Sequence, residues 1–189
     1  MSEALTSLDR MREVALDQHG FVTTAQARDL GISAALLAMM VRRGRVERVS
    51  HGVYRVGQVP TTPSDPWMQA VLWTGFPEAC LSHDSALDAW EISDINPNEI
   101  HVTVAAKRRV ERTIPKGYVI HRQDLTPRQM TWWEAIPTVT AATAIRQCLE
   151  TGVPTYLIRQ ALERSTKSGL VLAAEHAELT ELMEARYAR

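Results

Sequence analysis

The sequence predicts an α+β protein of two parts, and three observations predict it. The first sixty residues alternate short helical patterns with a hairpin pattern. A polar stretch with three prolines, 60–66, then interrupts the apolar periodicity. After it, strand-like segments mix with longer amphipathic helices, which is typical of a mixed α/β domain with a small sheet and several helices. We expect a first domain at residues 1–58, a linker at 59–66 and a second domain at 67–189.

Three helices are expected in the first domain, at residues 6–18, 25–30 and 34–43. Apolar side chains recur at three- and four-residue spacing in the first of them. Thr23 or Thr24 can cap the second helix and Ser33 the third, because a hydroxyl oxygen accepts from the free amides of a first turn. Gly31 and Gly44 end these two helices. Two short helices joined through Gly31 form a helix-turn-helix pattern.

The segment 46–56 alternates apolar and polar residues around Gly52, which predicts a β-hairpin. The side chains expected to face the core are Val46, Val49, Tyr54 and Val56. A helix, a helix-turn-helix and a hairpin in this order constitute a winged helix-turn-helix. On its third helix the spacing directs Leu37, Met40 and Val41 to the core, which leaves outside Ala34, Ala35, Ala38, Met39 and Arg42.

The net charge of -1 hides blocks of opposite sign. Residues 1–59 carry a charge of +2, with five arginines between positions 42 and 55. Residues 60–100 carry -7 and contain no lysine or arginine, whereas residues 101–122 carry +5. Basic blocks create local fields that attract polyanions even when the whole chain is nearly neutral. The net charge therefore does not exclude a nucleic acid as partner.

Short motifs follow one another along most of the chain: Gly20–Ala27, Gly31–Ser33, Arg42–Gly44, Arg48–Tyr54, Leu81–Leu87, Ile100–Val104 and Ala135–Thr140. Their order resembles the AbiEi-type antitoxin family of type IV toxin-antitoxin systems, to about residue 175. The resemblance implies a transcriptional autorepressor that binds operator DNA through its winged helix. It also implies a second domain that counteracts a nucleotidyltransferase-like toxin. Neither enzymatic activity nor a cofactor is expected.

The residues expected to contact DNA belong to the helix-turn-helix and the hairpin. They are Thr24, Ser33, Ala34, Arg42, Arg43, Arg45, Arg48, His51 and Arg55. Arginines neutralise phosphates, which supply most of the affinity, whereas base edges supply specificity. Ser33 begins a helix whose free amides can hold a phosphate. The alanine-rich outer face of that helix has few base-reading groups, and this favours the alternative of a protein-interaction module without sequence-specific DNA binding.

The second domain is expected to contain strands at 100–104, 117–122 and 136–139 and helices at 65–74, 85–90, 140–149, 154–166 and 170–187. A basic loop, 105–117, joins the first two strands and is interpreted as a hairpin tip. It supplies a second basic surface that would contact DNA or the toxin: Lys107, Arg108, Arg109, Arg112 and Lys116.

No catalytic or metal site is predicted. The run Ser82-His83-Asp84 contains the residue types of a hydrolase triad, but three consecutive residues cannot align nucleophile, base and orienting acid. Ser82 or Asp84 is interpreted as a helix cap, with His83 packed at the helix start. His101 and His121 lie on neighbouring strands without a third ligand, so they are interpreted as ordinary half-buried residues.

Several other classes of protein are disfavoured. A restriction-type nuclease needs Glu-x-Lys or Asp-x-Lys beside a further acid, and the sequence has no such tripeptide. No apolar run approaches the roughly 20 residues that span a bilayer, and residues 1–10 carry Glu3 and Asp9 where a secretory leader is basic and apolar. We expect a cytoplasmic protein with no membrane contact, in which Cys80 and Cys148 are reduced and mostly buried.

The expected partners are double-stranded DNA, in the form of an inverted-repeat operator, and a cognate nucleotidyltransferase-like toxin. No coiled-coil seam is visible. We therefore expect a monomer or weak dimer that pairs on DNA.

Overall fold

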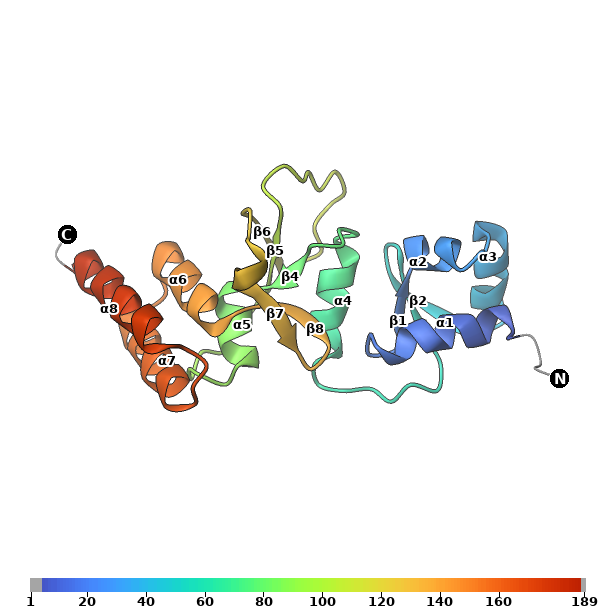
Figure 1. Cartoon of the computed structure of the whole chain (residues 1–189). Coiled ribbons are helices and arrows are strands. Elements are labelled where there is room, and N and C mark those ends of the chain that lie inside the picture. The colour runs from blue at the N-terminus through green and yellow to red at the C-terminus, as the bar shows by residue number, and fades with distance from the viewer. Residues whose placement is uncertain (1–4, 188–189) are drawn as a thin grey trace. The chain divides into compact units, whose positions relative to one another are not determined.

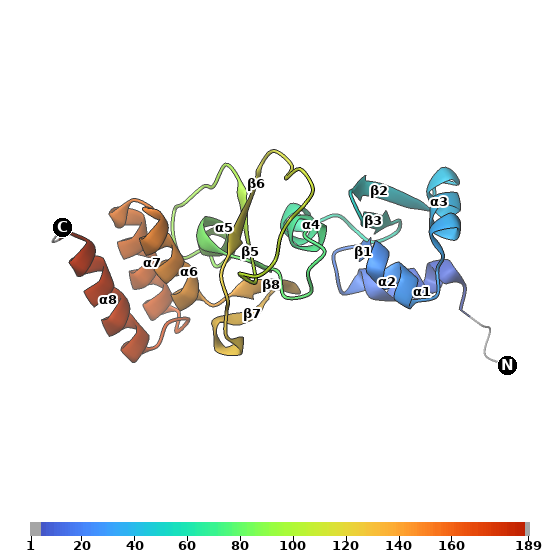
Figure 2. The same ribbon diagram turned by 90° about the horizontal axis from the view of Figure 1, so that it is seen from above.

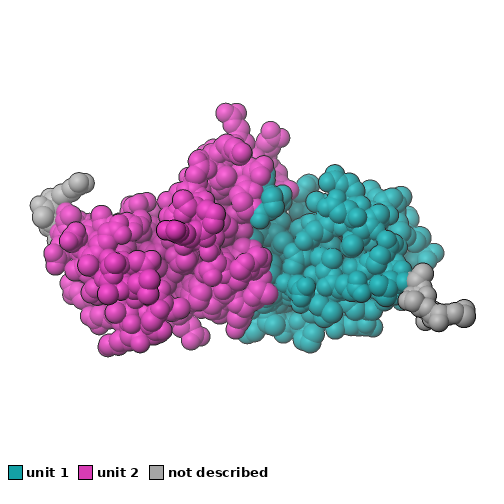
Figure 3. All heavy atoms as spheres, viewed as in Figure 1, with its two compact units in different colours: residues 1–77 teal, residues 78–189 magenta. Residues whose placement is uncertain are grey.

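The computed structural model describes residues 5–187, and the chain divides into two compact units, residues 1–77 and 78–189 (Figure 3). Figures 1 and 2 show the helices and strands from two directions. Each unit combines helices with one sheet, so the predicted α+β class is confirmed. None of the described helices is long and apolar enough to cross a membrane.

The first unit has the order of elements of a winged helix. These are α1 (Ser7–Leu16), β1 (Phe21–Thr23), α2 (Thr24–Asp29), α3 (Ala34–Arg42), β2 (Val46–Ser50) and β3 (Val53–Val56). The strands form an antiparallel sheet in the order β1-β3-β2, so β2 lies at an edge. The core beneath the sheet contains Met11, Ala15, Val22, Ala27, Ile32, Leu37, Met40, Val46 and Val56.

Local signals fix the ends of these helices. Thr23 is the N-cap of α2, and its hydroxyl accepts from the Gln26 amide at 3.2 Å. Ser33 caps α3 in the same way through the Leu36 amide, also at 3.2 Å. Gly31 lies after α2 with a φ of +76°, a left-handed conformation that glycine adopts without strain.

The hairpin departs from strict alternation. Val46 and Val56 are buried as predicted, but Val49 and Tyr54 are only half-buried, and Val53 is fully buried instead. A β-bulge between Arg48 and Ser50 interrupts the alternation of β2 at Val49, because the extra residue shifts the pairing register of β2 against β3.

Helix α4 (Asp65–Trp73) belongs to the first unit and contacts β1 and β3. The boundary between the units therefore lies after Pro77, whereas the sequence suggested a linker at 59–66. The Asp65 carboxylate accepts from the Arg55 guanidinium and from the Thr62 hydroxyl, both at 2.7 Å. These bonds hold the proline-rich stretch against β3.

The second unit is built on a five-stranded sheet in the order β6-β5-β4-β8-β7. Its elements are β4 (Cys80–Leu81), α5 (His83–Ala89), β5 (Ile100–Val104), β6 (Tyr118–Arg122), η1 (Pro127–Gln129), β7 (Met130–Trp133), β8 (Ile136–Val139), α6 (Ala141–Thr151), α7 (Thr155–Lys167) and α8 (Ala173–Tyr187). The main core lies where α5 to α8 pack together, and it includes Leu87, Ile145, Cys148, Ile158 and Leu179. Cys80 and Cys148 are free, buried thiols, as predicted.

The pairing of β5 and β6 corrects the interpretation of the loop between them. The two strands are parallel, with Ile100 opposite Tyr118 and Val104 opposite Arg122. A parallel pair requires the chain to return to the start of the first strand, so the basic segment 105–117 is a crossover connection. It is not a hairpin tip.

Candidate nucleic-acid interface

The outer face of α3 consists of small side chains. Ala34, Ala35 and Ala38 are exposed, whereas Leu37 and Met40 are buried in the core. These five residues follow the spacing predicted from the sequence, whereas Val41, expected in the core, and Met39, expected outside, are both half-buried. Three methyl groups leave the helix surface smooth, so a partner backbone or a groove of DNA can approach closely, but they offer no hydrogen bond to a base edge.

Four arginines follow this face in the chain, from the last residue of α3 to β2. Arg42, Arg43, Arg45 and Arg48 are exposed, and within residues 5–187 none of their side chains forms a hydrogen bond or an ion pair. Arg45 and Arg48 line one groove between the end of α3 and the hairpin, together with Glu47 and Gln58. Unpaired guanidinium groups on a groove wall are available to bind phosphate oxygens.

The tip of the hairpin lies beside the start of α2. The Thr24 amide and hydroxyl both donate to the Gly52 carbonyl oxygen, at 2.9 and 3.4 Å. Gly52 has a φ of +72°, which makes the tight turn possible. The fold therefore brings two predicted contact residues, Thr24 and His51, to one end of the unit, and both are exposed.

Arg55 departs from the predicted set, because its guanidinium group is used inside the unit. It pairs with Asp65, donates to the carbonyl oxygens of His19, Val59 and Pro60, and lies 5.1 Å from the centroid of the Phe21 ring. The Arg55 side chain is only 15% exposed. Arg55 is a structural residue that joins β3 to the segment before α4.

The cations of the second basic segment, 105–117, also fall into two groups, those used inside the unit and those that are exposed. The Arg108 guanidinium forms two hydrogen bonds with the Glu78 carboxylate, at 2.5 and 2.8 Å, so its charge is largely neutralised. Arg112 is half-buried, and burial lowers the pKa of its guanidinium group. The exposed cations are Lys107, Arg109 and Lys116. This surface is smaller than the five residues expected from the sequence.

The run Ser82-His83-Asp84 does not form a catalytic triad. The Ser82 hydroxyl lies 3.0 Å from His83 Nδ1 and accepts from the Thr103 hydroxyl at 2.8 Å, while Asp84 accepts from the thiol of Cys148 at 3.5 Å. Nucleophile, base and acid are thus not aligned. Ser82 precedes α5, but its side chain forms no capping bond, contrary to the sequence interpretation.

The same region holds a cluster that sequence reasoning missed. His83 lies beside His101 and His121, and one ligand nitrogen from each falls within 4.8 Å of the others. The expectation that His101 and His121 lack a third possible ligand is therefore corrected. The signal in the sequence was weak, because three histidines separated by 17 and 19 other residues match no metal-ligand spacing.

Comparison with known proteins finds a family match within the first unit. No curated protein is significantly similar to the chain in sequence. One solved structure with a detectable likeness is that of the RV2827C protein from Mycobacterium tuberculosis, with 14% identity and a TM-score of 0.40 over 96% of this chain and 83% of that one. Residues 9–57, which contain most of the winged helix, match the family described as "Transcriptional regulator, AbiEi antitoxin".

Proposed function

We propose that this chain is a DNA-binding transcriptional repressor that contacts its operator through α3 and the hairpin of the first unit. The observation that carries the proposal is the set of exposed arginines that have no partner among residues 5–187: Arg42, Arg43, Arg45 and Arg48. These arginines lie within the segment that matches a family of transcriptional regulators. Ser33, at the start of α3, and His51, at the hairpin tip, extend the same candidate surface.

Phosphate contacts are the main source of affinity in this proposal. Each arginine that neutralises one phosphate contributes about -0.9 to the slope of log K against log salt concentration. Four such contacts give a slope of about -3.6. The alanine face of α3 contributes mainly apolar contacts with thymine methyl groups, so we expect modest discrimination between sequences.

A salt titration of operator binding tests the proposal. Fluorescence anisotropy with a labelled fragment of the promoter upstream of this chain's own gene gives the slope. Replacing Arg42 and Arg48 together with alanine should lower its magnitude by about 1.8, because two phosphate contacts are lost. The matched control is Arg159→Ala, which removes an exposed arginine from α7 in the second unit and should leave the slope unchanged.

Two results would contradict the repressor proposal. One is a folded protein that binds no inverted repeat at moderate salt. The other is a slope that the double substitution leaves unchanged, since this would remove both arginines from the interface. In the first case the alanine face of α3 favours the alternative of a protein-interaction module, to which Ala34, Ala35 and Ala38 offer an apolar surface.

For the second unit we propose a role in counteracting a nucleotidyltransferase-like toxin. The exposed cations of the crossover segment support contact with an acidic partner: Lys107, Arg109 and Lys116. Co-expression with the product of a nucleotidyltransferase-like gene next to its own should restore growth. Substitution of the three cations by serine should weaken this rescue, whereas Arg159→Ser should not. Equal rescue by both variants would show that the three cations of the crossover segment do not contact the toxin.

A further inference from the structure

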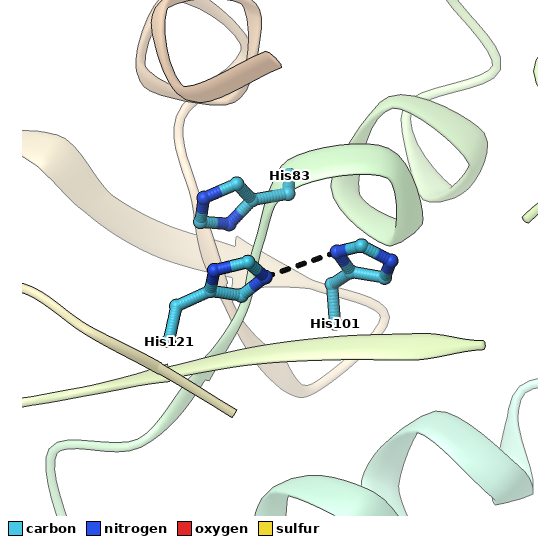
Figure 4. A group of neighbouring side chains, drawn as sticks. All are labelled: His83, His101 and His121. Atoms are coloured by element: carbon cyan, nitrogen blue, oxygen red, sulfur yellow. Dashed lines mark hydrogen bonds between the residues drawn. The ribbon is translucent and has the colours of Figure 1, made fainter. Parts of the chain in front are cut away.

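We propose that His83, His101 and His121 form a binding site for a zinc ion in the second unit. The three side chains come from three elements, the start of α5 and the parallel strands β5 and β6 (Figure 4). The inference is independent of DNA binding, because all three residues lie within residues 78–189.

The nitrogen atoms of the three imidazole rings lie close enough together to be drawn onto one metal ion. His101 Nδ1 and His121 Nε2 are 3.0 Å apart, and all three ligand nitrogens lie within 4.8 Å of one another. Zinc binds nitrogen at about 2.0–2.1 Å, which places the nitrogens of a tetrahedral site about 3.4 Å apart. One pair is therefore already near the required spacing. The His83 ring stacks on His121 with centroids 3.5 Å apart and planes 14° apart, so these two rings must turn out of the stack for both nitrogens to face one ion.

Buried polar partners fix the position of His83. Its Nδ1 lies 3.0 Å from the Ser82 hydroxyl, and that hydroxyl accepts from Thr103. This contact leaves the Nε2 atom of His83 as the ligand nitrogen. Metal-binding histidines commonly use their second nitrogen for such a hydrogen bond, which orients the ring.

The backbone of His83 is in an unusual conformation. Its φ is +50°, in the left-handed region that a residue with a Cβ atom rarely adopts. The His83 amide donates to the side-chain carbonyl of Gln147, which is almost fully buried, and Gln147 in turn donates to Gln123 at 2.7 Å. Backbone strain of this kind persists where the surroundings hold it, and it concentrates at functional sites. Here it directs the third imidazole toward the other two.

The charge state of the cluster suits a cation. Burial lowers the pKa of His83 to about 3 and that of His121 to about 4, and burial also lowers the pKa of His101. An ion bound between His101 and His121 would replace the hydrogen bond that now joins their nitrogens at 3.0 Å, and the displaced proton would pass to solvent. Asp84, whose charge is felt by both His101 and His121, supplies a nearby negative group that would favour a bound cation. Imidazole ligands favour zinc and neighbouring transition metals over magnesium or calcium.

Metal titration of the full-length chain, purified without a histidine tag and treated with a chelator, tests the site. We expect one zinc ion per chain by calorimetry and, with cobalt as a probe, the visible absorption of a tetrahedral complex. Zinc at about a hundred times its dissociation constant should raise the melting temperature of the second unit by about 10 °C. Absence of stoichiometric binding would overturn the proposal.

Substitutions locate the bound ion. His101→Gln and His121→Gln should each weaken binding at least a hundredfold, and Ser82→Ala should weaken it about tenfold or more. His83→Asn is the appropriate change at the strained position, because asparagine tolerates the left-handed conformation. The control is His176→Gln on α8, which should bind zinc as the unmodified chain does. Zinc binding that survives the first two substitutions together, in a protein that remains folded by circular dichroism, would exclude this site.

Discussion

Arg55 provides the sharpest test of the distinction between structural and DNA-binding arginines. Replacing it with methionine keeps most of the apolar stem but removes the guanidinium group. The Asp65 carboxylate then loses its ion pair with Arg55 and keeps only the contact with His19 Nδ1 at 3.5 Å as a second possible pair, and three carbonyl oxygens lose their donor. Both side chains of the pair are nearly buried, at 15% and 11% exposure, so solvent does not replace the lost interaction effectively.

The size of the effect follows from this burial. Removing one partner of a buried ion pair costs about 3–5 kcal/mol. Asp65 retains hydrogen bonds from the amide and hydroxyl of Thr62, which reduces the loss to about 2.5 kcal/mol. Because 1.36 kcal/mol corresponds to a factor of ten, amide exchange in β3 should become about 70-fold faster. Arg55→Lys should recover only part of the loss, since an ammonium group cannot reach all of these acceptors.

Hydrogen–deuterium exchange of peptides that cover residues 53–56 measures this change within the first unit alone. The matched control is Arg48→Ala, which removes an exposed arginine from β2 and should change exchange little while weakening operator binding. The reasoning is refuted if Arg55→Met leaves the exchange of β3 unchanged and weakens DNA binding as much as Arg48→Ala does. Arg55 would then be a DNA-contacting residue.

Three further predictions concern single side chains. Burial raises the pKa of the Asp65 carboxyl, but hydrogen bonds from Thr62 and the nearby Arg55 outweigh this and leave the pKa below its ordinary value. The stabilisation is therefore present above pH 4 and is lost as the pH falls below that value. Asp65→Asn should remove this acid-dependent step in urea unfolding. Burial raises the pKa of the Cys80 thiol to about 12, so iodoacetamide at pH 8 should leave it unmodified in the folded chain and label it in urea; labelling under native conditions would contradict its burial. Gly152 ends α6 with a φ of +87°, so Gly152→Ala should lower the melting temperature of the second unit by a few degrees in thermal unfolding, and an unchanged value would argue against that conformation.

The parts of the fold that could be predicted have local signals. Thr23 and Ser33 cap helices because their hydroxyl groups reach the next turn, and Gly31 permits the turn between them whatever the rest of the chain does. The spacing of apolar residues on α3 likewise determines which face is buried. These features involve residues only a few positions apart.

The parts that could not be predicted depend on distant residues. The two-residue strand β4 has no periodicity of its own and exists because β5 and β8 pair with it. The parallel pairing of β5 and β6 is not encoded in either strand. Nothing in the sequence around Arg55 sets it apart from the other arginines between positions 42 and 55. Only the position of Asp65 in the fold shows that Arg55 is used inside the unit. The histidine cluster likewise required the sheet and α5 to bring its members together.

The short strand β4 also bears on how the chain is made. Leu81 pairs with Val102 on one side and with Thr138 on the other, whereas the most distant strand pair of the first unit joins Phe21 and Arg55. Pairings between distant residues form slowly, and domains generally fold as units during synthesis. The winged helix can thus finish folding while the ribosome is still translating the second unit. A nascent chain that ends before Thr138 has one side of β4 exposed, and such an open edge is prone to pair with another chain.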